Sequence, residues 1–221
     1  MNLRLVLIAG AMLSPAVAHA MPVSPGFEQG PAVGTISFTP TDTDGLGWFA
    51  SNTDGERIVT TVGKPAAEGN YYASLLQNSG AYDGAPLGTG NFGFTGFDRI
   101  YATFPVLSSS TYNVSFQHAS DDRFNYLAGT SVVEIVDFNS NATLSQMSFA
   151  TPGLFDWQTV SFQFNTGATT TTAAIAFTVM GNANASGVFD AIDVSLVPEP
   201  SAVALVAMAI AGLCFPAIRR R

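Results

Sequence analysis

Cysteine is almost absent from this chain, and its one cysteine lies in an unusual place. Of 221 residues only Cys214 is a cysteine, and it lies in an apolar segment near the C terminus. The central part of the chain can therefore form no internal disulfide and offers no thiol nucleophile. It must rely on an apolar core, which about 175 residues are enough to build.

Basic residues are also scarce. The chain has 8 lysine and arginine residues against 16 acidic ones, and four of the basic residues (Arg4 and Arg219 to Arg221) lie close to its ends. Residues 21–197 thus hold 15 acidic and 4 basic side chains, a net charge of −11. Such a surface repels phosphate backbones, so we expect no nucleic-acid partner. Solubility and cation binding are the expected consequences.

Histidine is nearly missing as well. Beyond the first 20 residues only His118 remains, inside a predicted strand, where we expect it to be packed or surface-exposed rather than catalytic. Serine triads and zinc sites with several histidines are hard to assemble from one histidine.

Paired carboxylates keep a glycosidase as an alternative, although aspartates of this kind are typical of turns. The pairs are Asp121 with Asp122, Asp42 with Asp44, and Asp54 with Glu56.

The first 20 residues have the pattern of a secretion signal. Arg4 is followed by an apolar stretch from Leu5 to Leu13, and Ala18-His19-Ala20 supplies small residues around a cleavage point. The apolar stretch is short for a permanent membrane span. We expect residues 1–20 to form a signal helix that is removed, so that the mature chain begins near Met21.

The C-terminal segment, residues 197–221, has three parts in order. Val197, Pro198, Glu199 and Pro200 form an acidic tetrapeptide whose prolines favour extended chain. Residues 202–218 are apolar and at helical rise span roughly 25 Å, which is short of a full hydrocarbon core, so the expected transmembrane helix relies on the terminal arginines to extend to the far interface. Arg219, Arg220 and Arg221 follow, and their charge would hold that end in the cytoplasm.

This order closely resembles the PEP-CTERM sorting signal of Gram-negative bacteria. The resemblance covers Val197 to Arg221 and implies recognition by an exosortase, a membrane peptidase that processes the tail during delivery. It implies an inner-membrane anchor that is transient and a destination at the cell surface or in the extracellular matrix.

Between the ends, residues 21–196 have the pattern of one all-β domain. Short runs of β-branched and aromatic residues alternate with Gly, Asn, Asp and Ser, and no long helical period occurs. The expected strands are 35–38, 57–62, 71–77, 100–103, 111–119, 131–137, 143–149, 158–165, 172–180 and 188–196. Ten short strands indicate a two-sheet antiparallel β-sandwich.

Several short pieces resemble the galactose-binding-like jelly-roll sandwiches that include many carbohydrate-binding modules. They are Pro25-Gly26-Phe27-Glu28, Gly47-Trp48, Ala67 to Tyr71, Thr111 to Phe116, Trp157 to Phe162 and Phe189 to Val194. The resemblance implies a structural calcium held by Glu28 and Asp190. Carboxylate oxygens suit calcium, although Ala191 stands where that family has an Asn or Asp.

Sugar binding needs aromatic faces beside polar side chains, and two loop segments offer both. The candidates are Tyr82, Asp83, Asn91, Phe92, Phe94, Asp121, Arg123, Asn125 and Tyr126. Local packing of a Gly-rich loop is the alternative role for these aromatics, whereas Trp48 and Trp157 are expected in the core.

The preferred hypothesis is an exported, noncatalytic β-sandwich that binds extracellular polysaccharide or another matrix polymer. A structural or self-associating biofilm matrix protein is the first alternative, and a secreted glycoside hydrolase is the second.

Overall fold

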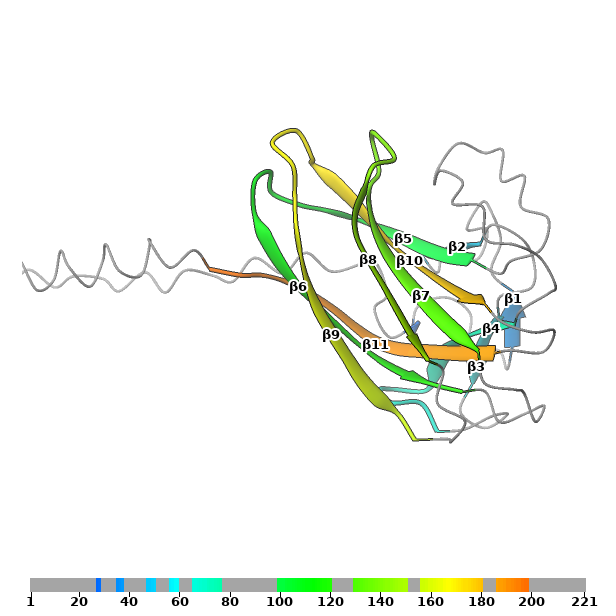
Figure 1. Cartoon of the computed structure of the whole chain (residues 1–221). Coiled ribbons are helices and arrows are strands. Elements are labelled where there is room, and N and C mark those ends of the chain that lie inside the picture. The colour runs from blue at the N-terminus through cyan, green and yellow to red at the C-terminus, as the bar shows by residue number, and fades with distance from the viewer. Residues whose placement is uncertain are drawn as a thin grey trace, which may run out of the picture.

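The computed structural model describes residues 27–28, 35–37, 47–50, 56–59, 65–76, 99–120, 129–150, 156–180 and 186–198. Two sheets lie face to face, and every strand pairing in them is antiparallel. Figure 1 shows β6, β9 and β11 in one layer and β5, β7 and β10 in the other. The predicted fold class, an all-β two-sheet sandwich, is therefore confirmed.

The first sheet has six strands in the order β1-β3-β4-β11-β6-β9, and the second has five in the order β2-β5-β10-β7-β8. The eleven strands are β1 (Thr35–Ser37), β2 (Phe49–Ala50), β3 (Glu56–Val59), β4 (Tyr71–Leu76), β5 (Arg99–Pro105), β6 (Thr111–Ala119), β7 (Thr130–Asp137), β8 (Thr143–Ala150), β9 (Gln158–Asn165), β10 (Thr172–Met180) and β11 (Ser186–Leu196).

All ten predicted strands are present, with ends that differ by a few residues. β2 was not predicted, because two residues are too short to show an alternating pattern. The predicted signal helix and transmembrane helix lie outside the described residues. Within the described residues, no helix is long and apolar enough to span a membrane.

The core lies between the sheets and is dominated by aromatic rings. Phe177 on β10 and Phe189 on β11 are fully buried, with ring centres 4.5 Å apart, so this contact joins the two layers. Trp48 is fully buried against Phe27 and Phe177, as predicted. Such contacts contribute about 0.5–1.5 kcal/mol each beyond the area they bury.

His118 and Trp157 serve structural roles. His118 is 1 % exposed, its Nε2 lies 2.9 Å from the hydroxyl of Ser131, and its ring packs against Phe149 and Phe189. Of the two roles expected for His118, packed or surface-exposed, the structure shows the packed one. Trp157 was expected in the core but is only half-buried: its indole N–H donates to the carbonyl of Pro65, and its ring meets the edge of Tyr72.

Candidate functional site

The outer face of the five-stranded sheet carries an unusual mixture of side chains. Alternate residues of β10 point to opposite faces, so Ile175 and Phe177 enter the core while Ala174 and Ala176 face outward. The register places Tyr101 of β5 on one side of Ala176 and Glu134 of β7 on the other. Phe49 of β2 lies opposite Tyr101 and extends the same row. We call these residues, with Arg99, Val136 and Phe138, the outer face.

Aromatic rings form one part of the outer face. Phe49 stacks on Tyr101 with ring centres 5.2 Å apart and an angle of 21° between the rings, and Phe138 lies 6.4 Å from Tyr101 on another side. Phe49 and Phe138 are half-buried, whereas Tyr101 is 4 % exposed. Burial raises the pKa of the Tyr101 hydroxyl, and the positive charge of Arg99 opposes that shift only in part. Tyr101 therefore stays protonated and able to donate a hydrogen bond.

An ion pair forms the other part. The guanidinium of Arg99 donates to the carboxylate of Glu134, and both side chains are almost completely buried. Arg99 is on β5 and Glu134 on β7, so the pair reaches across the central strand β10, where Ala176 leaves room for it. Taking these two charges out of water costs desolvation energy. In binding pockets, charged side chains can set the orientation of a polar ligand.

A second cluster lies where Glu28 and Asp190 meet the segment before β4. The Asp190 carboxylate accepts backbone hydrogen bonds from Ala67 (2.7 Å), Glu68 (2.9 Å) and Ala191 (2.8 Å). Glu28 Oε1 accepts from the backbone of Asn70 (2.7 Å) and Tyr71 (2.9 Å). The structure thus brings the two predicted metal ligands to neighbouring positions of one short segment, 67–71. We call this arrangement the carboxylate clamp.

The backbone around the clamp is strained. Phe27 (φ 57°) precedes Glu28, and Ala191 (φ 49°) follows Asp190. Gly69 (φ 64°) lies between the two points of attachment. A Cβ at Gly69 would overlap the Glu28 carboxylate, so this close approach requires glycine. Left-handed backbone costs about 1–2 kcal/mol at a non-glycine residue, and it persists where surrounding contacts impose it.

Charge is poorly balanced at the clamp. Asp190 is fully buried, and burial raises its pKa to about 7 despite the three N–H donors, with the nearby charge of Glu68 adding to the shift. Arg99 is the one basic residue whose side chain is described, and it pairs with Glu134. Within the described ranges, Glu28 Oε2 accepts no hydrogen bond, so an oxygen remains for a cation. The chemistry of the two carboxylates fits calcium.

A complete metal site is not present among the described residues. They contain no group of three or more His, Cys, Asp or Glu side chains placed to hold one ion. Backbone carbonyls or water would have to supply the other oxygen ligands that calcium takes.

The remaining predicted site residues divide as follows. Every predicted sugar-binding residue (Tyr82, Asp83, Asn91, Phe92, Phe94, Asp121, Arg123, Asn125 and Tyr126) lies outside the described residues, as do Glu199, Pro200 and Arg219 to Arg221. Val197 and Pro198 directly follow β11, and the Val197 N–H donates to the carbonyl of Thr111.

Sequence reasoning missed the outer face. The available signal was a charged residue among apolar ones in each of two strands, Arg99 at the start of β5 and Glu134 in the middle of β7. The pairing across β10 depends on register, which the sequence alone does not supply.

No family model matches the chain, and no curated protein matches it. Solved structures do match, at low identity. The carbohydrate-binding module TmCBM61, determined with β-1,4-galactotriose, is 18 % identical with a TM-score of 0.51, and the match covers 81 % of this chain and 100 % of that one. The xylan-binding domain CBM22-1 of Paenibacillus barcinonensis Xyn10C is 13 % identical with a TM-score of 0.51, covering 83 % and 97 %.

A cyclase from Fischerella sp. TAU, determined with 4-(1H-indol-3-yl)butan-2-one, is similar to the same degree. It is 15 % identical with a TM-score of 0.53, and the match covers 82 % of this chain and 98 % of that one. The fold is therefore that of carbohydrate-binding-module-like β-sandwiches. Since binding modules and a cyclase share it, fold alone does not define the ligand.

Proposed function

We propose that this chain is an exported, noncatalytic glycan-binding protein whose outer face binds extracellular polysaccharide. The observation that carries the proposal is that Phe49 and Phe138, both half-buried, flank the buried Tyr101 on the sheet face that also holds the buried Arg99–Glu134 ion pair. Aromatic faces suit the apolar sides of sugar rings, and charged or amide groups suit their hydroxyls. The carbohydrate-binding modules of similar fold support this ligand class.

The predicted loop residues fit the same location by their chain positions. Residues 82–94 precede β5, and residues 121–126 lie between β6 and β7. β5 begins at Arg99 and β7 begins at Thr130, and both strand starts flank the end of β10. In this proposal Tyr82, Asp83, Asn91, Phe94, Asp121, Arg123, Asn125 and Tyr126 extend the binding face beyond the sheet.

The clamp and the tail complete the proposal. Glu28 and Asp190 would hold a structural calcium, whose positive charge would offset the burial of Asp190. Residues 1–20 direct export, and an exosortase recognises Val197 to Pro200 while residues 202–218 anchor the chain in the inner membrane. Mass spectrometry of the protein recovered from cells tests the tail: loss of residues after Val197 is expected, and an intact C terminus contradicts processing.

Glycan binding is tested by affinity electrophoresis of the mature chain in gels that contain β-1,4-galactan, β-1,4-xylan or cellulose derivatives. Phe49→Ala and Phe138→Ala remove half-buried rings, and each is expected to weaken retention by up to about tenfold, the equivalent of about 1.4 kcal/mol. Gln163→Ala on the outer side of the other sheet is the matched control and should bind normally. No retention in any gel by the wild type would overturn the proposal.

Self-association is a second candidate function, favoured by the two adjacent edge strands. β8 and β9 are the last strands of their sheets, each has eight residues, and neither carries a charge. Charged residues on edge strands commonly prevent pairing with another copy. Sedimentation of the wild type and of Ser161→Lys distinguishes the cases: assembly that the lysine abolishes supports self-association, and a monomeric wild type excludes it.

A further inference from the structure

Among the residues that the structure describes, those at one end of the sandwich carry no exposed charge. This end comprises the connections 105–110, 138–142 and 166–171 together with residues 196–198, where the chain leaves β11; we call it the exit end. Backbone hydrogen bonds join its parts: Val106 N–H to Thr171, Ser109 N–H to Gly167, and Val197 N–H to Thr111. Figure 1 shows the three connections at the same end of the two sheets.

The absence of charge at the exit end contrasts with the chain's net charge. The mature chain is strongly acidic, yet none of these four segments contains Asp, Glu, Lys or Arg. Among the described residues, the acidic side chain that adjoins these segments is Asp137, which is 6 % exposed; in the sequence, Glu199 directly follows Pro198. The Asp137 carboxylate accepts from the hydroxyl of Thr170 and from the backbone of Asn139 and Ser140, so its charge is directed inward. The exposed residues of these segments are uncharged: serine, threonine and asparagine together with Pro105, Leu107, Ala142, Gly167, Ala168 and Pro198.

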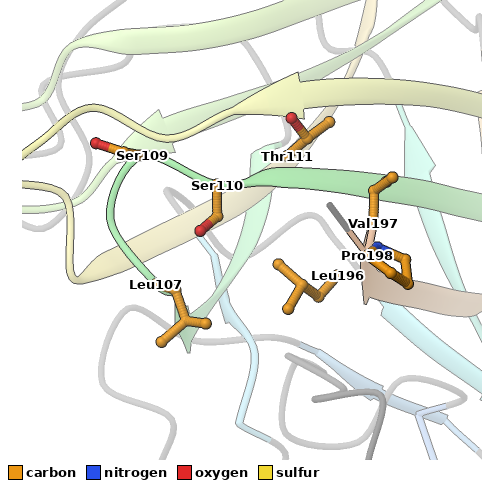
Figure 2. Close-up of a pocket in the computed structure, with 7 residues that line it drawn as sticks. All are labelled: Leu107, Ser109, Ser110, Thr111, Leu196, Val197 and Pro198. Carbon is orange, nitrogen blue, oxygen red and sulfur yellow. The ribbon is translucent and has the colours of Figure 1, made fainter. Parts of the chain in front are cut away.

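An apolar contact point lies next to the chain exit. Leu107 is 55 % exposed, the one large apolar side chain exposed to that degree among the described residues. It lines a cavity of about 260 Å³ together with Leu196 and Pro198. Figure 2 shows these three side chains around the cavity, with Ser109 and Ser110 on the adjoining connection.

Chain length fixes how far this end can be from a membrane. Three residues lie between Pro198 and the start of the predicted transmembrane segment at residue 202, and these four steps along the chain reach about 14 Å when fully extended. The headgroup layer itself is about 5–8 Å thick on each side of a bilayer. While the tail is uncut, the exit end must therefore lie within a few ångströms of the headgroups.

We propose that the exit end is a membrane-contact surface that rests on phospholipid headgroups, with Leu107 inserted among them, until the tail is processed. The proposal rests on the proposed membrane tail. An acidic surface in this position would be repelled by anionic lipids at about 1 kcal/mol per charge near the membrane. Uncharged hydroxyl and amide groups avoid this cost, and one leucine adds a modest attraction.

The test uses the uncut mature chain in vesicles of phosphatidylethanolamine and phosphatidylglycerol, with an environment-sensitive fluorophore at one cysteine. Three positions are labelled separately: native Cys214 in the tail, Ser108→Cys at the exit end and Thr159→Cys at the far end of β9, the last two with Cys214→Ser. Position 159 lies about 20 Å along β9 from Asn165, which gives a matched control. Nitroxide quenchers are placed either on the headgroup or in the acyl chain.

The acyl-chain nitroxide is expected to quench the fluorophore at position 214. The headgroup nitroxide should quench the fluorophore at position 108 at least threefold more strongly than the fluorophore at position 159. Adding Leu107→Asp to the 108-labelled chain should reduce its quenching while 214 stays inserted. If the tail inserts but the fluorophores at positions 108 and 159 are quenched equally, the proposed membrane-contact surface is overturned while the proposed membrane tail stands. No quenching of 214 overturns the proposed tail itself, and this inference with it.

Discussion

At the scale of single residues, the carboxylate clamp concentrates strain and charge in a few positions. Phe27, Gly69 and Ala191 have left-handed backbone, and they adjoin or lie between the two carboxylates that bind segment 67–71. Such strain persists only where other contacts impose it, and here those contacts are five hydrogen bonds from backbone N–H groups to Glu28 and Asp190. The clamp ties the start of the domain to its last strand.

Ala191→Gly should stabilise the domain. Relief of left-handed strain is worth about 1–2 kcal/mol, and glycine costs about 0.5–1 kcal/mol of unfolded-state entropy. We expect a net gain of about 0.5–1 kcal/mol, or a few degrees in Tm, by thermal unfolding. Ala176→Gly, at extended backbone, is the control and should destabilise; a loss of stability for Ala191→Gly would show that the strain is absent.

Asp190 should make stability depend on pH. Because its folded pKa is raised to about 7 by burial, the folded state keeps a proton that the unfolded state releases above its ordinary pKa near 4. The stability from this group is fully present below about pH 4 and is lost as the pH rises to about 7, by up to about 4 kcal/mol. Urea unfolding in a calcium chelator measures this directly.

Asp190→Asn and added calcium separate the causes. The amide keeps the shape and an acceptor without charge, so the variant should lose this pH dependence. Calcium favours the ionised carboxylate and should raise the stability of the wild type at neutral pH but not that of the variant. Identical pH profiles for wild type and variant would exclude Asp190 as the source, and an unchanged Tm on chelation would exclude the metal.

At the scale of the elements, strand β10 organises the candidate site. Arg99 of β5 lies opposite Thr178 and Glu134 of β7 lies opposite Ala176, so the ion pair crosses β10 where the small side chain of Ala176 leaves room. A larger residue at position 176 would separate the pair. The neighbouring strands, rather than the loops, therefore fix the relative positions of Tyr101, Arg99 and Glu134.

Breaking this ion pair should destabilise the domain more than replacing it. Glu134→Gln leaves the Arg99 guanidinium buried without its counter-charge, which should cost about 3–5 kcal/mol in the free energy of unfolding. Arg99→Met with Glu134→Leu removes both charges and should recover most of that loss. Urea titrations measure both effects.

The same double variant separates stability from function. If the buried pair positions the rings of the outer face, the double variant should fold and yet bind polysaccharide more weakly than the wild type. A single variant as stable as the wild type would show that the pair is not desolvated.

At the scale of the whole molecule, the sequence predicts the elements better than the site. Alternation in Thr111–Ala119 and Gln158–Asn165 reflects local periodicity, so strands and fold class follow from it. Glu28 and Asp190 were predicted through resemblance, and the structure brings both to segment 67–71. The outer face could not be predicted, because it depends on which strands flank β10 and in what register.

The outer sides of the two sheets differ in the chemistry of their side chains. The outer side of the six-stranded sheet is a polar ladder, with hydrogen bonds from Thr111 to Asn165, from Gln163 to Asn113 and from Gln117 to Thr159. Away from this ladder, the same side carries the buried Tyr72 and the half-buried Trp157, whereas the outer face of the other sheet holds Phe49, Tyr101 and Phe138. The proposal places glycan binding at the outer face and expects none at the polar ladder of β6 and β9.

Hydrogen–deuterium exchange of the mature chain, with and without the polysaccharide that retains it most strongly, tests glycan binding by the outer face most directly. Protection is expected in peptides that cover β2, β5 and the part of β7 around Glu134, with no change in β6 and β9. Protection confined to β6 and β9, or no protection while the chain is bound, would contradict binding at the outer face.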